Sequence, residues 1–371
     1  MKKTIAWILI SIMCLCLLAG CAAPAAPVAQ EPAPATQEPA PAPAVEEPVA
    51  EQPEEPASEE ITVTDVTGRS VTFAQPATAI VGTHNPSLNT AIVLGGGGDY
   101  LAGFGNKQMA NGLYGLVIEN WDGVPQIGKG KEINYEAVAV LGDNLVAILP
   151  ERFADQAESY EQIGVPAVVA LPNTESFDTI KSSLALVAQV LGLEDRAVAV
   201  NAFFDEKIAA AKEIGAKSEA KPSVLFLGSS SQLSVATSAM IQTEIIDTAG
   251  GINAVSGVEK AGDFAEVSIE EIIGWDPEVI WIPSYAKYTV DDLMNDPAWA
   301  DITAIKNNAV YVFPSALEPW DYPSASACLG VCWAVQNLHP DLYTQAQLMA
   351  DVDGFYDLVY GQTFTAEQLG L

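Results

Sequence analysis

The stretch "INYEAVAVLGDNLVAIL", residues 133–149, decides the fold because the chain nearly repeats it as "VSIEEIIGWDPEVIWI", residues 267–282. Each copy begins with a good N-cap residue, Asn134 or Ser268, continues with a short helical pattern and ends in an apolar run. Runs that are apolar throughout are typical of parallel strands covered on both faces. The repeat therefore predicts two lobes that share one α/β plan.

Similar apolar runs alternate with helical patterns along the chain, as expected of an α/β protein. The runs are Ala79–Val81, Tyr100–Gly103, Leu145–Leu149, Ala167–Leu171, Val224–Leu227, Val279–Ile282 and Val310–Phe313. Before them, "ITVTDVTGRSVTF", residues 61–73, alternates apolar and polar residues around Gly68 and predicts an entry hairpin. The runs fall into two groups, which supports the prediction of two lobes.

A long helix separates the two groups of strands. Residues 194–214 contain no Gly and no Pro, and their apolar side chains fall on one helical face. We therefore predict an α/β fold with two lobes, each with a mostly parallel sheet flanked by helices, joined by one long backbone helix. The predicted boundaries are 61–192 for the N-terminal lobe, 193–217 for the connecting helix and 218–371 for the C-terminal lobe. So stiff a connection predicts a small closure of the lobes.

The N-terminus is a targeting segment. Lys2 and Lys3 precede an apolar run that ends in Leu-Ala-Gly-Cys21, and this pattern resembles a bacterial lipoprotein signal. We predict a signal peptide at 1–20, lipidation of Cys21 and a Pro/Ala/Glu-rich tether at 21–60. The protein would then be exported and anchored to the outer face of the cell membrane or to the periplasmic side of a bacterial membrane. The alternative is an ordinary secretory signal with an incidental cysteine.

The charge balance limits the classes of partner. The chain has 16 basic and 48 acidic residues, a net charge of −32, which argues against a nucleic-acid partner. Only Arg69, Arg152 and Arg196 supply guanidinium groups for an anion pocket. Cys328 and Cys332 lie one helical turn apart in an apolar run, where we favour two buried free thiols over a metal site.

Candidate ligand-binding residues follow the predicted strands, because ligands of open α/β sheets bind beyond the C-terminal strand ends. The candidates are His84, Asn85, Arg152, Phe153, Ser229, Ser230, Tyr285, Tyr288, Trp320 and Tyr322. They combine aromatic surface with a few polar groups, as a small-molecule cleft requires. We predict no metal site of the protein's own; His84 either contacts a metal carried by the ligand or donates a hydrogen bond, and we favour the second interpretation.

The sequence does not favour catalysis. Ser284 to Lys287 fits S-x-x-K but lacks the companion motifs, and Asp247-Thr248-Ala249-Gly250 occurs once where an aspartic protease needs two such aspartates. The glycines from Gly95 to Gly98 end a predicted helix and lack the Lys-Ser or Lys-Thr of a phosphate loop. We predict that the protein is not an enzyme; an exported α/β hydrolase and a surface adhesion protein are the alternatives from other classes.

Several segments in order resemble one family. The segments are "TVTDVTGRSVTF", "AIVLGGGGDYLAGFG", "DTAGGINAV", "IKNNAVYVFPS", "LHPDLY" and "FYDLVYGQTFTAEQL". The chain resembles the substrate-binding lipoproteins of ABC importers for iron complexes and cobalamin. The resemblance implies a monomer without a cofactor that captures a metal complex and delivers it to an ABC permease dimer with its cytoplasmic ATPase. A ferric siderophore is the favoured ligand, with cobalamin or another corrinoid, haem and an oxyanion as alternatives.

The resemblance also gives the opening repeat a meaning. In that family one glutamate on each lobe docks onto arginines of the permease, and Glu136 and Glu270 match those positions. The other interpretation is that each glutamate only complements its helix dipole.

Overall fold

The computed structural model describes four segments: residues 60–107, 112–219, 221–258 and 263–371. The predicted signal peptide 1–20, the lipidated Cys21 and the tether up to residue 59 lie outside the described residues. No helix in the described segments is long and apolar enough to cross a membrane.

The first strands form the predicted entry hairpin. β1 (Ile61–Thr64) pairs antiparallel with β2 (Ser70–Phe73). The turn is closed by Asp65, whose Oδ1 accepts the backbone N–H groups of Thr67 and Arg69. Gly68 in this turn has a φ of 84°, a left-handed conformation that glycine adopts at little cost.

The N-terminal lobe is built on a parallel sheet with the order β4-β3-β7-β8. Its strands are β3 (Ala79–Val81), β4 (Leu101–Gly103), β7 (Leu145–Pro150) and β8 (Ala167–Leu171). Alternate side chains of β7 enter two separate cores, with Ile148 in one and Leu149 in the other. Because both faces are covered, every residue of β7 and β8 is buried, as the apolar runs predicted.

Helices and a small hairpin complete this lobe. They are α1 (Asn85–Gly95), α2 (Tyr114–Val117), α3 (Tyr135–Val138), α4 (Ala157–Gln162), α5 (Phe177–Leu191) and the pair β5 (Gly128–Lys129) and β6 (Glu132–Ile133). α1 ends at Gly96 in the left-handed conformation, so the glycine run closes a helix as predicted.

The C-terminal lobe repeats the same sheet order as β11-β9-β13-β14, again parallel. Its strands are β9 (Ser223–Phe226), β11 (Ile252–Asn253), β13 (Val279–Pro283) and β14 (Val310–Phe313). Around them lie α7 (Ile241–Thr248), α8 (Ile269–Trp275), α9 (Val290–Met294), α10 (Thr303–Lys306) and the pair β10 (Ser234–Val235) and β12 (Ala265–Glu266). The two copies of the opening motif are therefore α3 with β7 and α8 with β13.

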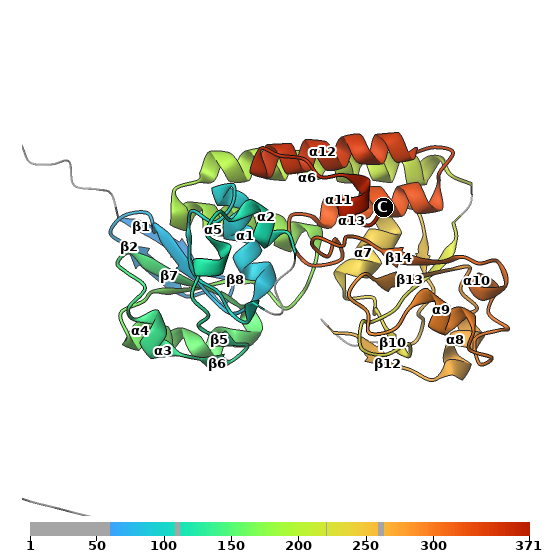
Figure 1. Cartoon of the computed structure of the whole chain (residues 1–371), viewed down its shortest axis with the longest axis horizontal. Helices are drawn as coiled ribbons and strands as arrows, with labels where there is room; N and C mark the ends of the chain where they lie inside the picture. The colour runs from blue at the N-terminus through green and yellow to red at the C-terminus, as the bar shows by residue number, and fades with distance from the viewer. Residues whose placement is uncertain (1–59, 108–111, 220, 259–262) are drawn as a thin grey trace, which may run out of the picture. The chain divides into compact units, whose positions relative to one another are not determined.

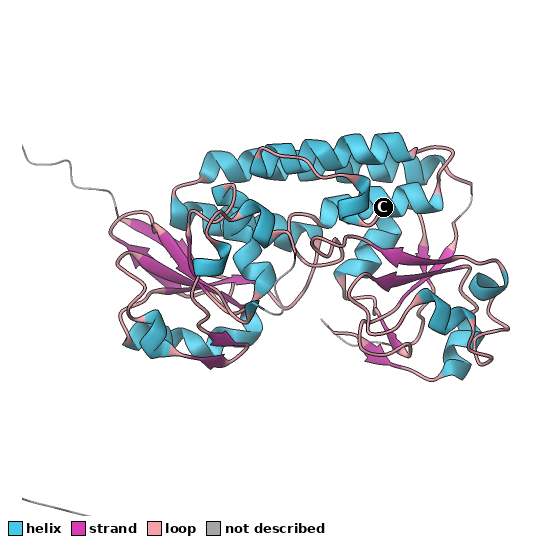
Figure 2. Ribbon diagram, viewed as in Figure 1, coloured by secondary structure: helices cyan, strands magenta, loops and turns pink. Residues whose placement is uncertain are grey.

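One long helix runs between the lobes. α6 (Glu194–Lys217) has 24 residues, which makes it about 36 Å long at 1.5 Å per residue. Its buried face includes Ala197, Val200 and Phe204 and packs on α5, α11 (Ala327–Leu338) and α12 (Gln345–Tyr360). Figures 1 and 2 show α6 and α12 running together along one side of the two sheets. The predicted fold class is confirmed.

Two of the three arginines make contacts that stabilise the fold. Arg196 in the first turn of α6 donates to backbone carbonyls at the C-terminal ends of α1 and α12, among them those of Leu94 and Val359. A cation placed at two helix C-termini also complements both helix dipoles. Arg69 forms ion pairs with Asp65 and Glu161. Of the predicted guanidinium groups, only Arg152 is left for the cleft.

The cysteines of α11 behave as predicted. Cys328 and Cys332 are free and buried. Burial raises the pKa of both thiols above the ordinary value.

Candidate functional site: a cleft between the strand ends of the two lobes

A cavity of about 430 Å³ lies among the loops that follow the C-terminal ends of the parallel strands. Loops after β3, β7 and β8 line it from the N-terminal lobe, and loops after β13 and β14 line it from the C-terminal lobe. In both sheets the first and third strands of the lobe are neighbours, and their loops diverge at the point where the strand order reverses. In the N-terminal lobe the cavity therefore lies where the loops after β3 and β7 diverge.

His84 and Arg152 form a pair at this point of the N-terminal sheet. Nδ1 of His84 lies 2.8 Å from Oγ of Ser87, and Nε2 of His84 accepts a hydrogen bond from Arg152. Since an arginine can only donate, the proton of the imidazole must sit on Nδ1. Burial, and then the nearby charge of Arg152, lower the pKa of His84 to about 3, so the ring is neutral at physiological pH.

The two hydrogen bonds of His84 determine whether it can bind a metal carried by a ligand. Both ring nitrogens of His84 already have partners, which leaves no lone pair for a metal carried by a ligand. In the described part of the chain, no group of three or more His, Cys, Asp or Glu side chains is arranged to hold a metal ion.

Lys129 and Arg152 supply positive charge to the N-terminal side of the cavity, and we call them the donor wall. Lys129 ends β5, and the loop beside it is held by Thr83, whose hydroxyl donates to the carbonyl of Gly130 at 2.6 Å. Phe153 supports Arg152: the guanidinium carbon lies 5.7 Å from its ring centroid, and the same ring meets His84 edge to face.

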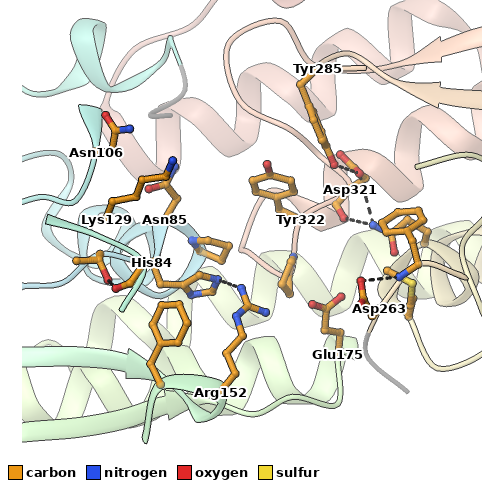
Figure 3. A pocket seen from close by; sticks show the side chains of 18 residues that line it. His84, Asn85, Asn106, Lys129, Arg152, Glu175, Asp263, Tyr285, Asp321 and Tyr322 are labelled. Carbon is orange, nitrogen blue, oxygen red and sulfur yellow. Dashed lines mark hydrogen bonds between the residues drawn. The ribbon is translucent and has the colours of Figure 1, made fainter. Parts of the chain in front are cut away.

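Polar acceptors line the rest of the cavity, and we call Gln242, Tyr285 and Asp321 of the C-terminal lobe, together with Glu175 after β8, the acceptor wall. Tyr285 donates its hydroxyl proton to Oδ2 of Asp321 at 2.7 Å, and Gln242 donates to the backbone carbonyl of Asp321 at 2.9 Å. Figure 3 shows Tyr285, Asp321 and Glu175 across the cavity from His84 and Lys129.

Burial changes the pKa of the two carboxyl groups of the acceptor wall. Desolvation raises the pKa of Asp321 to about 6, although the hydrogen bonds from Tyr285 and Gln242 favour its charged form. Desolvation likewise raises the pKa of Glu175 to about 7, against the opposing charge of Arg152 and a hydrogen bond from the backbone of Ile241.

The structure brings six of the ten predicted ligand residues to the cavity: His84, Asn85, Arg152, Phe153, Tyr285 and Tyr322. The rings of Tyr285 and Tyr322 meet edge to face with centroids 5.3 Å apart. Beyond them lies a second hollow of about 620 Å³, whose described lining has no charged side chain.

The other four predicted residues do not line this cavity. Trp320 does not fit the prediction, because it is fully buried and donates its indole N–H to the hydroxyl of Tyr356 at 3.0 Å. Tyr288 points back to its own sheet and donates to the carbonyl of Gly228 at 2.7 Å. Ser229 and Ser230, after β9, also lie outside the lining.

Sequence reasoning missed the acids and Lys129. Asp321 stands between two residues that were predicted, Trp320 and Tyr322, so the loop after β14 was the right place to look. Glu175 follows β8 in the same way and could have been found by the same rule.

The two predicted docking glutamates are exposed first-turn residues. Glu136 lies in α3 and Glu270 in α8. Asn134 caps α3 by accepting the N–H of Ala137, whereas Ser268 and Glu271 form a reciprocal capping box on α8. Other side chains therefore make both caps. Figure 1 shows α3 and α8 on the side of each lobe away from α6 and α12.

Comparisons with known proteins agree with this architecture. A family model described as periplasmic binding protein matches residues 87–317. The molybdate-binding protein MolA of Haemophilus influenzae is 22% identical over 324 residues, which cover 81% of this chain and 91% of MolA. The Fe(3+)-citrate-binding protein YfmC of Bacillus subtilis is 25% identical over 206 residues, 55% of this chain and 63% of YfmC.

Solved structures show the same fold. A periplasmic solute binding protein from Veillonella parvula superposes with a TM-score of 0.72 at 23% identity and covers 84% of this chain and 95% of its own. MolA of Haemophilus influenzae bound to molybdate also has a TM-score of 0.72, at 19% identity, and covers 82% of this chain and 99% of its own.

Proposed function

Because this chain belongs to the periplasmic binding protein family, we propose that it captures a small metal chelate, with a ferric siderophore as the favoured ligand, and delivers it to an ABC importer. Members of the family bind solutes rather than catalyse reactions, work outside the cytoplasm and pass small molecules to ABC permeases. The same proposal includes lipidation of Cys21, which would anchor the protein to the membrane.

The size and polarity of the cavity carry the proposal. About 430 Å³ is within the range typical of small-molecule sites and far exceeds what a tetrahedral oxyanion fills. The donor wall suits the oxygen-rich face of a chelate, and the rings of Phe153, Tyr285 and Tyr322 suit its apolar skin. Iron would arrive as part of the ligand, since the described residues offer no metal cluster of their own.

An oxyanion such as molybdate is the second candidate. The observation in its favour is the similarity to MolA, which extends over 81% of this chain. The acceptor wall argues against it, because an anion without a hydrogen-bond donor cannot satisfy Oδ1 of Asp321 and Oε1 of Gln242, which have no partner among the described residues. The two candidates require opposite behaviour from the acceptor wall and can therefore be separated.

A panel of ligands tests the proposal by thermal unfolding of the purified exported protein. The panel is ferric citrate, a ferric trihydroxamate, a ferric catecholate, cyanocobalamin, haemin and molybdate, with each iron-free chelator as its control. We expect one or more ferric chelates to raise the melting temperature, since a ligand at 100 times its Kd adds about 2.7 kcal/mol. Arg152→Gln should remove most of this effect by weakening the donor wall. Stabilisation by molybdate alone would overturn the chelate proposal in favour of the oxyanion.

A further inference from the structure

The acceptor wall contains buried acceptors that lack donors. Asp321 is 0% exposed; its Oδ2 accepts from Tyr285, but its Oδ1 has no hydrogen-bond partner among the described residues. Gln242 is 3% exposed, and its Oε1 also lacks a partner within the described segments. Buried acceptors without donors are costly, so a cluster of them beside a cavity calls for a donor from outside the chain.

The direction of each hydrogen bond is fixed by chemistry. Nε2 of Gln242 faces the carbonyl and the carboxylate of Asp321, which can only accept, so the amide must be oriented with Oε1 on its other side. Tyr285 uses its single hydroxyl proton on Asp321. The phenol oxygen of Tyr285 can therefore act toward a ligand only as an acceptor.

The charged side chains are unevenly distributed around the cavity. Lys129 and Arg152 supply positive charge from the donor wall. Across the cavity stand the carboxyl groups of Glu175 and Asp321, with Asp263 beside them at the lining. A ligand that is negative all round would meet repulsion from one wall, and a ligand that is positive all round would meet repulsion from the other.

Resting on the proposed function, we infer that the ligand is a dipolar chelate: its oxygen-rich face lies against Lys129 and Arg152, and a cationic donor group, such as an ammonium, points to Tyr285 and Asp321. Asp321 acts here as a specificity residue. Gln242 positions Asp321 by a hydrogen bond to its backbone carbonyl, and Tyr285 donates its hydroxyl proton to the carboxylate. The negative charge of Asp321, directly and through the phenol oxygen of Tyr285, favours chelates that carry the cationic donor group.

One pair of probes isolates the donor group. A linear ferric trihydroxamate with a terminal ammonium is compared with the same chelate after acetylation of that amine, which removes the charge and leaves the iron centre unchanged. We expect the protein to bind the ammonium form at least tenfold more tightly by calorimetry, which equals 1.4 kcal/mol. Equal affinity for the two probes would overturn the inference and leave the chelate proposal standing.

Variants assign the preference to the acceptor wall. Asp321→Asn keeps an acceptor for Tyr285 but removes the charge, and it should reduce the preference for the ammonium probe to less than threefold. Tyr285→Phe removes the phenol oxygen and serves as the second test if Asp321→Asn does not fold. Asp301→Asn, an exposed carboxylate in a loop before α10, is the matched control and should keep the preference.

The remaining outcomes are also decisive. A preference that survives both Asp321→Asn and Tyr285→Phe would show that another part of the chain reads the ammonium, and the inference would be wrong. Failure of both chelates to bind would also overturn it. Binding of molybdate alone would overturn the proposed function itself.

Discussion

A single buried carboxyl joins the two lobes beneath the cleft. Glu318 lies in the loop after β14, and its Oε1 accepts the hydroxyl of Tyr356 at 3.0 Å. Its Oε2 lies 3.5 Å from the amide nitrogen of Asn89, which belongs to α1 of the other lobe. Desolvation raises the pKa of Glu318 to about 7, although these hydrogen bonds favour the charged form.

This raised pKa predicts how stability depends on pH. In the unfolded chain Glu318 titrates near 4.5, so between about pH 4.5 and 7 the folded state binds more protons than the unfolded state. The free energy of unfolding therefore falls as pH rises through this window. Glu318→Gln removes this titrating group. At 1.36 kcal/mol per pKa unit, the variant should avoid a decrease in the free energy of unfolding on the order of 3 kcal/mol between pH 5 and pH 8. Its melting temperatures at these two pH values should therefore differ less than those of the unchanged protein.

The comparison must be made between variants, because other groups titrate too. Glu175 and Asp321 act with the same sign, whereas the lowered pKa of His84 acts with the opposite sign below pH 6.5. Glu119→Gln, an exposed control, should melt with the pH dependence of the unchanged protein. An identical pH dependence in Glu318→Gln would mean that folding does not raise the pKa of Glu318.

At this scale the sequence predicted part of the cleft. The rule that ligands meet the C-terminal ends of strands found His84, Arg152 and Tyr285. It failed for Trp320 because nothing in an irregular loop tells which of several neighbours faces inward. The surroundings that make Asp321 a candidate specificity residue include Gln242 of α7 and Tyr285 in the loop after β13, which lie far away in the sequence.

Among the elements, α6 depends on one close backbone contact. Gly215 near its end lies against Gly250, which follows α7. A Cβ added to Gly215 would come within 2.9 Å of the Cα and N atoms of Gly250, closer than side chains approach backbone. Glycine therefore costs α6 some helix propensity but lets it approach the C-terminal lobe.

Replacing this glycine should be harmful although alanine favours helices. We expect Gly215→Ala to lower the free energy of unfolding by about 1–3 kcal/mol, as overpacking does, against a gain of about 1 kcal/mol in helix propensity. Gly274→Ala in α8 is the matched control, since a Cβ there meets nothing within 4 Å and should be neutral or stabilising. Urea unfolding of both variants measures the difference, and equal free energies would contradict the close contact.

The long elements were predictable and the short ones were not. The long apolar runs that form β7 and β13, and the one-sided apolar face of α6, carry patterns that a sequence displays directly. The pairs β5 with β6 and β10 with β12 have two residues per strand, too few to show any alternation.

The two lobes repeat one plan, and the opening sequence motif stands at the same place in each. Both sheets have the same strand order, and α3 and α8 stand before their third strands. A symmetric permease dimer needs equivalent contacts from the two lobes. Glu136 and Glu270 are exposed at equivalent positions and are not required for either cap.

We therefore predict that Glu136→Lys combined with Glu270→Lys abolishes uptake while ligand affinity and melting temperature stay close to those of the unchanged protein. The physical reason is that lysines would repel the arginines which the family resemblance implies on the permease, whereas the cleft residues are untouched. Glu206→Lys with Glu213→Lys on α6 makes the same change of net charge on the side of the lobes away from α3 and α8, and it should leave transport intact. Uptake of the labelled ligand by cells and calorimetry on the purified variants separate the two effects. If the Glu136→Lys and Glu270→Lys variant transports normally, or if it loses ligand binding, the docking role is wrong. Each glutamate then only complements its helix dipole.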